Sequence, residues 1–149
     1  MKYRNEWKYQ VSAAELVVLE ARLRPIMPPD KHHRPGGYAI RSLYFDDFAN
    51  RCFQENESGV DDRRKFRIRL YNGVTDVIKL EVKEKKNGMT HKASCSIDAE
   101  QCYRILQGEP PRIGNDVPAP MNLLSVAMRT AGMAPKVIVE YERTAYVSP

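Results

Sequence analysis

The sequence has few cysteines, no long apolar run and no internal repeat. Its three cysteines among 149 residues are odd in number and lack paired spacing, so they predict neither a disulfide framework nor a zinc site. We expect Cys52, Cys95 and Cys102 to be reduced thiols in a cytoplasmic protein. No apolar run approaches the roughly 18 residues of a membrane-spanning helix, and the first ten residues hold no apolar signal-peptide core. We therefore expect no membrane segment in this chain.

The chain also lacks the composition of a disordered protein. Hydrophobic residues make up 42% and charged residues 29%, which is typical of a globular chain. The length suits a single domain over residues 1–149. Lysine and arginine exceed the acidic residues and give a net charge of +5. This excess favours an anionic partner such as nucleic acid, a phosphorylated metabolite or an acidic surface, although solubility alone also accounts for it.

Alternation of polar and apolar residues predicts a fold made mainly of antiparallel strands. Asn72-Gly73 and Asn87-Gly88 suit tight hairpin turns, because both residue types tolerate positive φ. Residues 62–97 are therefore predicted to form a three-strand meander. Further strands are predicted over 2–11, with Trp7 packed in the core and Tyr9 on the same face, and over 38–47, 51–57 and 136–147.

Three helices are predicted from their capping and stop signals. Ser12, with Glu15 three residues later, has the pattern of a capping box, and Pro25 ends that helix. Asp98 is predicted to cap a second helix that ends before Gly108, and a third covers residues 121–132. Together the elements predict an α+β fold, in which about three helices flank an antiparallel sheet.

The strand that begins near residue 64 has an unusual polar face. Lys65, Arg67 and Arg69 alternate with apolar residues, so the three cations lie on one side of the strand. A solvated outer face explains such a row on any single strand. Recurrence over four predicted strands instead indicates a basic surface interrupted by carboxylates, suited to polyphosphate and to a divalent metal. The residues of the same phase on the other strands are Glu6, Lys8, Glu81, Lys83 and Lys92.

Five stretches in one order carry a family resemblance. They are "RNEWKYQVS", "YAIRSLYFDD", "RKFRIRLY", "IKLEVKEK" followed by "THKAS", and "VEYERTAYV". Together they resemble the VTC domain, the polyphosphate polymerase domain of the vacuolar transporter chaperone family, within the triphosphate tunnel (CYTH-like) superfamily. The resemblance implies an antiparallel barrel whose walls bind a triphosphate or polyphosphate chain. It also implies transfer of the γ-phosphate of ATP to polyphosphate, with Mn²⁺ or Mg²⁺ as cofactor.

The resemblance and the strand phases assign the site residues. Lys8, Arg67, Arg69 and Lys83 match the basic residues that hold the reacting phosphates, and we expect them to be catalytic. The expected substrate-binding residues are Lys65, Lys92, Tyr141, Arg143, Tyr44 and Ser42. Glu6 and Glu81 are the candidate metal ligands, whereas the phase of Arg41 places it on the opposite face.

Relatives in this family carry further strands after the one that matches residues 136–147. The resemblance therefore predicts a partial tunnel, weak turnover by this chain alone, and a homodimer formed through the exposed edge of the last strand. A non-catalytic polyphosphate- or nucleotide-binding module and a triphosphate hydrolase stay open as alternatives. Nucleic acid is not expected as a partner, because Trp7, Tyr9 and Phe66 are predicted on the face opposite the cations.

Overall fold

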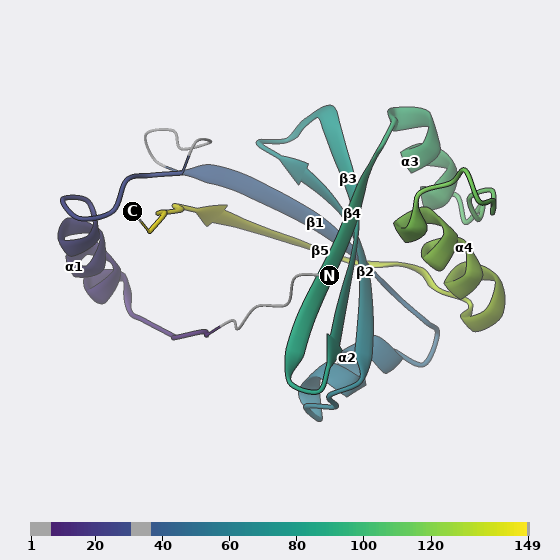
Figure 1. Ribbon diagram of the computed structural model, residues 1–149, viewed down its shortest axis with the longest axis horizontal. Helices are drawn as coiled ribbons and strands as arrows, with labels where there is room; N and C mark the ends of the chain where they lie inside the picture. The colour runs from purple at the N-terminus through teal and green to yellow at the C-terminus, as the bar shows by residue number, and fades with distance from the viewer. Residues whose placement is uncertain (1–6, 31–36, 149) are drawn as a thin grey trace.

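The structure is a computed structural model that describes residues 7–30 and 37–148 (Figure 1). Four helices and five strands occur in these residues, in a mixed α+β arrangement. In chain order they are α1 (Ala13–Leu23), β1 (Tyr38–Asp46), α2 (Arg51–Glu57), β2 (Arg63–Tyr71), β3 (Val74–Lys86), β4 (Met89–Ile97), α3 (Ala99–Leu106), α4 (Ala119–Ala131) and β5 (Ala134–Arg143).

All five strands form one antiparallel sheet in the order β4-β3-β2-β1-β5. Among the described residues the sheet is open rather than closed, with β4 and β5 at its edges. Both predicted hairpin turns are confirmed, because Asn72-Gly73 and Asn87-Gly88 all have positive φ. The meander of β2, β3 and β4 is therefore joined by tight turns that fix which side chains share a face.

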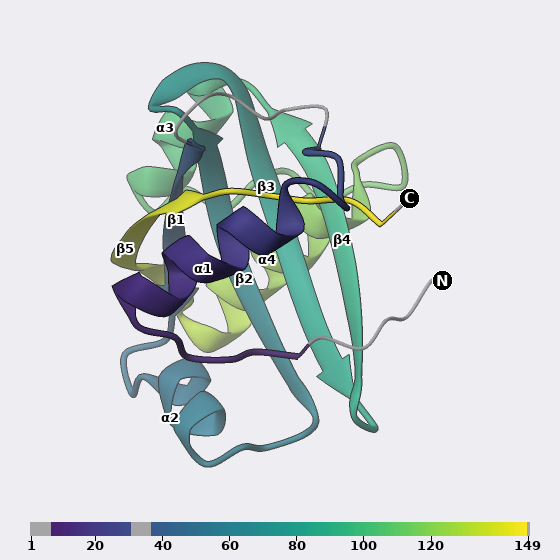
Figure 2. The same ribbon diagram turned by 90° about the vertical axis from the view of Figure 1, so that its left-hand side faces the viewer.

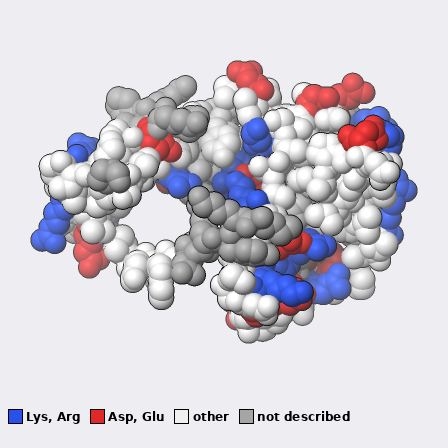
Figure 3. Space-filling view, in the orientation of Figure 1, with Lys and Arg blue, Asp and Glu red and all other residues white. Residues whose placement is uncertain are grey.

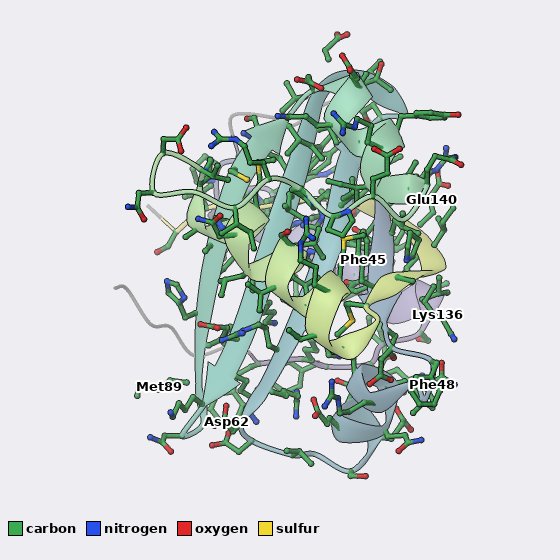
Figure 4. The ribbon with its side chains drawn as sticks, turned by 90° about the vertical axis from the view of Figure 1, so that its right-hand side faces the viewer. Phe45, Phe48, Asp62, Met89, Lys136 and Glu140 are labelled. Atoms are coloured by element: carbon green, nitrogen blue, oxygen red, sulfur yellow. The ribbon has the colours of Figure 1, made fainter. Side chains whose placement is uncertain are left out.

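The main hydrophobic core lies between the sheet and the helices α3 and α4. Figure 1 shows both helices on one side of the sheet, and Figure 4 shows α4 crossing the strands on that side. Apolar residues of β2, β3 and β4 pack there against Ile105 of α3 and against Met121, Leu124 and Met128 of α4. One face of the sheet is thus covered, and its polar face points away from these helices.

Two of the predicted helix starts are confirmed in atomic detail. The Ser12 hydroxyl accepts a hydrogen bond from the Glu15 amide, and the Glu15 carboxylate accepts one from the Ser12 amide. Asp98 and Gln101 form the same reciprocal arrangement at α3. The third predicted helix is α4, which ends at Gly132 in the left-handed conformation.

The prediction of a strand over residues 51–57 is wrong, because these residues form helix α2. The cause is the buried carboxylate of Asp46 at the end of β1. Its oxygens accept hydrogen bonds from the backbone amides of Cys52 and Phe53 at 2.8 and 3.0 Å. These bonds satisfy amides in the first turn of the helix, where no intrahelical partner exists.

The prediction of a first strand over residues 2–11 is also wrong for residues 7–11, the part of it that the structure describes. Residues 7–12 form no strand, and Trp7 is 79% exposed rather than packed in the core; Tyr9 is exposed as well. Helix α1 lies entirely within the described range 7–30 and buries none of its residues. Figure 2 shows α1 passing in front of the sheet, on the side opposite α3 and α4. Within the described residues, none of the helices is both long and apolar enough to span a membrane.

Candidate anion-binding site

The uncovered face of the sheet collects the cations of β2 and β3. Strand register places Arg67 opposite Glu81, and Lys65 opposite Lys83. On the other side of β2, Arg67 lies opposite Tyr44. Because residues directly opposite one another point to the same side of a sheet, all five side chains share one face. This is the face that the row of cations in the sequence predicts.

A hollow of about 670 Å³ lies over this face, and we call it the basic cleft. Six cations line it, and none of the acidic residues in the described part of the chain does. Figure 3 shows several lysine and arginine side chains close together over the α2 end of the sheet. The lining consists of Lys8, Arg63, Lys65, Arg67, Lys83 and Lys85 with Tyr44, Asn56, Gly88, Thr90 and Tyr141.

The concentration of positive charge affects Lys65 most clearly. Burial lowers the pKa of its ammonium group, and the charges of Arg63, Lys83 and Lys8 lower it further. Its Nζ donates a hydrogen bond to the Asn56 side chain of α2 at 2.7 Å. A bound anion would relieve the repulsion among these cations, so the cleft is electrostatically suited to a multiply charged anion.

Glu81 lies beneath the cleft as the counterion of three cations. Its side chain is 2% exposed, and its Oε2 accepts a hydrogen bond from Nε of Arg67 at 2.6 Å. Lys92 pairs with Oε1, and Nη1 of Arg69 lies 3.8 Å from Oε2. Burial alone would raise the pKa of Glu81, but the hydrogen bond from Lys92 and the charge of Arg67 outweigh it and lower the pKa.

Arg69 is buried and contacts the walls of the cleft rather than its interior. Its Nε donates to the Ser42 hydroxyl at 3.1 Å, and its Nη2 donates to the Tyr141 hydroxyl at 3.4 Å. Ser42 is itself fully buried. Arg69 and Ser42 therefore do not line the cleft, and Arg69 holds Tyr141, which does.

Arg67 is held in place from two sides. Besides its bond to Glu81, its Nη1 donates to the Tyr44 hydroxyl at 3.1 Å, and its guanidinium carbon lies 5.9 Å from the centre of the Tyr44 ring. Burial would lower the pKa of Arg67, but Glu81 and Tyr44 keep it raised, so the group stays charged. The arrangement fixes the direction of the guanidinium fork, which matters for bidentate contact with phosphate.

Besides Arg69 and Ser42, two further predicted site residues do not line the basic cleft. Arg143 lines a separate hollow of about 890 Å³ near α1. Lys92 is bound to Glu81 and does not line the cleft. As its phase predicts, Arg41 lies on the opposite face, where its Nε donates to Glu140 at 2.9 Å.

The residues described here do not fit a resident divalent metal. No group of three or more His, Cys, Asp or Glu side chains gathers anywhere in the described residues. Glu81 is one carboxylate, and both of its oxygens are taken by cations. Glu6, the other predicted ligand, lies outside the described residues. A requirement for Mn²⁺ or Mg²⁺ therefore stays a prediction.

Sequence reasoning missed some of the lining residues. Arg63 and Lys85 continue the alternating phase of Lys65 and Lys83, so extending that alternation would have found them. Thr90 is the register partner of Lys85 on β4. Nothing in the sequence indicates that Asn56 lines the cleft, because Asn56 reaches it from helix α2, whose residues are predicted as a strand.

Another hollow of about 660 Å³ lies on the helix-covered side, beside α2 and α4. It also contains cations, among them Arg51 and Arg64. Unlike the basic cleft, it is lined by the carboxylates of Glu55, Asp62 and Glu84. Arg64 is already paired with Glu84 at 2.5 Å. The net attraction for an anion is therefore weaker here than in the basic cleft.

Comparison with known proteins gives one match to a family. The family model described as the VTC domain matches residues 3–149. No curated protein matches the chain. The matched region includes every strand of the sheet and every described residue that lines the basic cleft.

Proposed function

The chain belongs to the VTC domain family, a family of polyphosphate polymerases, and from this we propose that its basic cleft binds polyphosphate or the triphosphate of ATP. One observation carries the proposal: six cations and no described acidic residue line the hollow. Phosphate chains bear a negative charge on every unit, so they match such a lining along its length. The planar guanidinium of Arg67 suits bidentate contact with two phosphate oxygens.

The reaction that suits this cleft is phosphoryl transfer from ATP to a polyphosphate end. A terminal oxygen of the acceptor chain bonds to the γ-phosphorus, the bond from that phosphorus to the β–γ bridging oxygen breaks, and ADP leaves with the electron pair. Such a step needs in-line positioning and charge neutralisation more than covalent help from the protein. Lys8, Arg67 and Lys83 would contact the phosphates, and Arg69 would position Tyr141.

A non-catalytic binding module remains the second candidate. The observation that favours it is the open sheet, since among the described residues the cations come from one wall and the segment that bears Lys8. A turnover assay with ATP and Mn²⁺ decides between the two. Formation of phosphate chains would assign a polymerase, release of free phosphate would assign a hydrolase, and binding without either would assign the module.

Binding itself is tested by calorimetry with tripolyphosphate. Arg67→Ala is expected to weaken binding by about 1.5–3 kcal/mol, the scale of a hydrogen bond to a charged group. Arg67→Lys should also lose affinity, because it keeps the charge but loses the fork. Arg41→Ala is the matched control on the opposite face and should bind like wild type. Equal affinity for wild type and Arg67→Ala would refute the proposal.

We further propose that the chain forms a homodimer through β5. We also propose that it works in a reducing compartment such as the cytoplasm. Strand β5 is an edge of the sheet and exposes Ile138 and Val139. The three free thiols agree with a reducing compartment. Light scattering is expected to give twice the monomer mass, and Ile138→Lys is expected to shift it to the monomer. A wild-type monomer would contradict this assembly.

A further inference from the structure

A second hollow, of about 370 Å³, continues from the basic cleft toward α2. Tyr44, Asn56 and Lys65 line both hollows, so the two share a boundary. The remaining walls of the second hollow come from the end of β1, from α2 and from the start of β5. We call it the aromatic hollow; its other lining residues are Phe45, Asp46, Asn50, Cys52, Phe53, Lys136 and Val137.

The aromatic hollow differs in chemistry from the basic cleft beside it. Phe53 and Val137 line it and are 62% and 51% exposed, so an apolar ligand surface would cover them. Phe45 also lines the hollow, and Tyr44 adds a third aromatic ring at the boundary. Asn50 makes no side-chain cap hydrogen bond to α2 in the described structure, which leaves an amide in the lining. The lining also includes the charged side chains of Asp46, Lys65 and Lys136, and a hollow that combines apolar surface with a few polar groups is typical of sites for small organic molecules.

We propose that the aromatic hollow holds the nucleobase of a nucleoside triphosphate whose phosphates lie in the basic cleft. This inference rests on the proposed function, since the phosphates must occupy the cleft for the base to reach the hollow. Lys65 and Tyr44, at the shared boundary, would then lie between base and phosphates. A bare polyphosphate chain offers nothing apolar to contact Phe53 or Val137, whereas a base has a flat π-face that stacks on aromatic rings.

Asn56 lies where the basic cleft and the aromatic hollow meet, as a residue that contacts both base and phosphates would. Asn56 lines both hollows, and its carbonyl oxygen accepts the hydrogen bond from Lys65. Side-chain amides of asparagine pair with donor and acceptor groups on base edges. The volume of the hollow, about 370 Å³, lies in the range of roughly 300–1,000 Å³ found for ligand sites.

The test compares ATP with tripolyphosphate on two phenylalanine variants. Phe53→Ala removes an exposed ring that lines the aromatic hollow. Phe48→Ala is the matched control, because Phe48 is 90% exposed nearby in the chain and does not line the hollow. Figure 4 shows Phe48 and Lys136 close to α2, at the same end of the sheet. Affinities for both ligands are measured by calorimetry at one salt concentration, and each ligand is compared only between variants.

We expect Phe53→Ala to weaken ATP binding about fivefold or more, the lower end of the effect of removing a stacking ring. Its tripolyphosphate affinity should stay at the wild-type value, which also shows that the variant is folded. Phe48→Ala should change neither affinity. Unchanged ATP affinity in Phe53→Ala, or an equal loss for both ligands, would overturn the nucleobase site. Wild-type protein that binds neither ligand would instead overturn the proposed function, and this inference with it.

Discussion

Replacing Glu81 by glutamine separates its role as a counterion from a role as a metal ligand. The carboxylate is 2% exposed and neutralises Arg67 and Lys92, with Arg69 close by. Glutamine keeps the shape and one acceptor but removes the negative charge. The positive charges of Arg67, Arg69 and Lys92 would then repel one another without a compensating negative charge, so we expect the fold to lose stability.

The magnitude follows from the burial of the pair. Removing one partner of a buried ion pair costs about 3–5 kcal/mol. Lys92 is 40% exposed and can turn toward water, so we expect a smaller loss for Glu81→Gln of about 2–4 kcal/mol. Glu84→Gln is the matched control on the same strand, because its pair with Arg64 lies on the other face and is much more exposed to solvent than the pair of Glu81 with Arg67. A loss of under about 1 kcal/mol is expected there.

The lowered pKa of Glu81 determines how the stability of the fold changes with pH. A carboxylate with a lowered pKa stabilises the fold above its ordinary value of 4.5, and that stabilisation is lost as the pH falls through the lowered pKa. Wild-type protein should therefore lose stability in acid by more than Glu81→Gln does. Urea unfolding at neutral and acidic pH measures both effects.

The two possible roles of Glu81 predict opposite changes in the anion affinity of Glu81→Gln. As a counterion it opposes anions, so Glu81→Gln should bind tripolyphosphate about twofold to fivefold more tightly without metal, the effect of removing one like charge. Ligand at about 100 times its dissociation constant should restore roughly 2.7 kcal/mol of stability. Unchanged stability, or weaker binding in the absence of metal, would refute the counterion role.

Two further predictions concern Lys65 and Asp46. Binding of phosphate should raise the lowered pKa of Lys65, so the protein takes up a proton when tripolyphosphate binds. The affinity for tripolyphosphate should therefore fall as the pH rises from that lowered pKa toward 10.5. Calorimetry should show this fall in wild type but not in Lys65→Arg, and an identical pH profile for the two proteins would contradict the prediction. Asp46→Ala should destabilise the protein by about 1.5–3 kcal/mol, because it leaves the amides of Cys52 and Phe53 without their acceptor. Urea unfolding measures this loss of stability, and a loss below about 0.5 kcal/mol would show that the carboxylate of Asp46 does not stabilise α2.

The meander could be predicted because its signals are local. Asn72-Gly73 and Asn87-Gly88 set the turns, and alternation between them sets the face of each side chain. Helix α2 could not be predicted in the same way. Its first-turn acceptor is the side chain of Asp46, six residues before Cys52, and it works only because β1 ends beside the helix. Such tertiary capping leaves no pattern within residues 51–57.

The candidate site was predictable in its composition but not in its charge balance. The phase of Lys65, Arg67 and Lys83 gives their common face directly from the sequence. The sequence does not reveal that Glu81 binds Arg67 and Lys92, because that depends on burial and on the register of β4. These contacts separate the cations lining the cleft from those that stabilise the sheet beneath it.

A crystal structure of the protein with bound tripolyphosphate tests the central claim most directly. We expect phosphate oxygens within about 2.7–3.2 Å of the side-chain nitrogens of Lys65, Arg67 and Lys83 in the basic cleft. Phosphate bound instead beside Arg51 and Arg64, in the hollow on the helix-covered side, would contradict it.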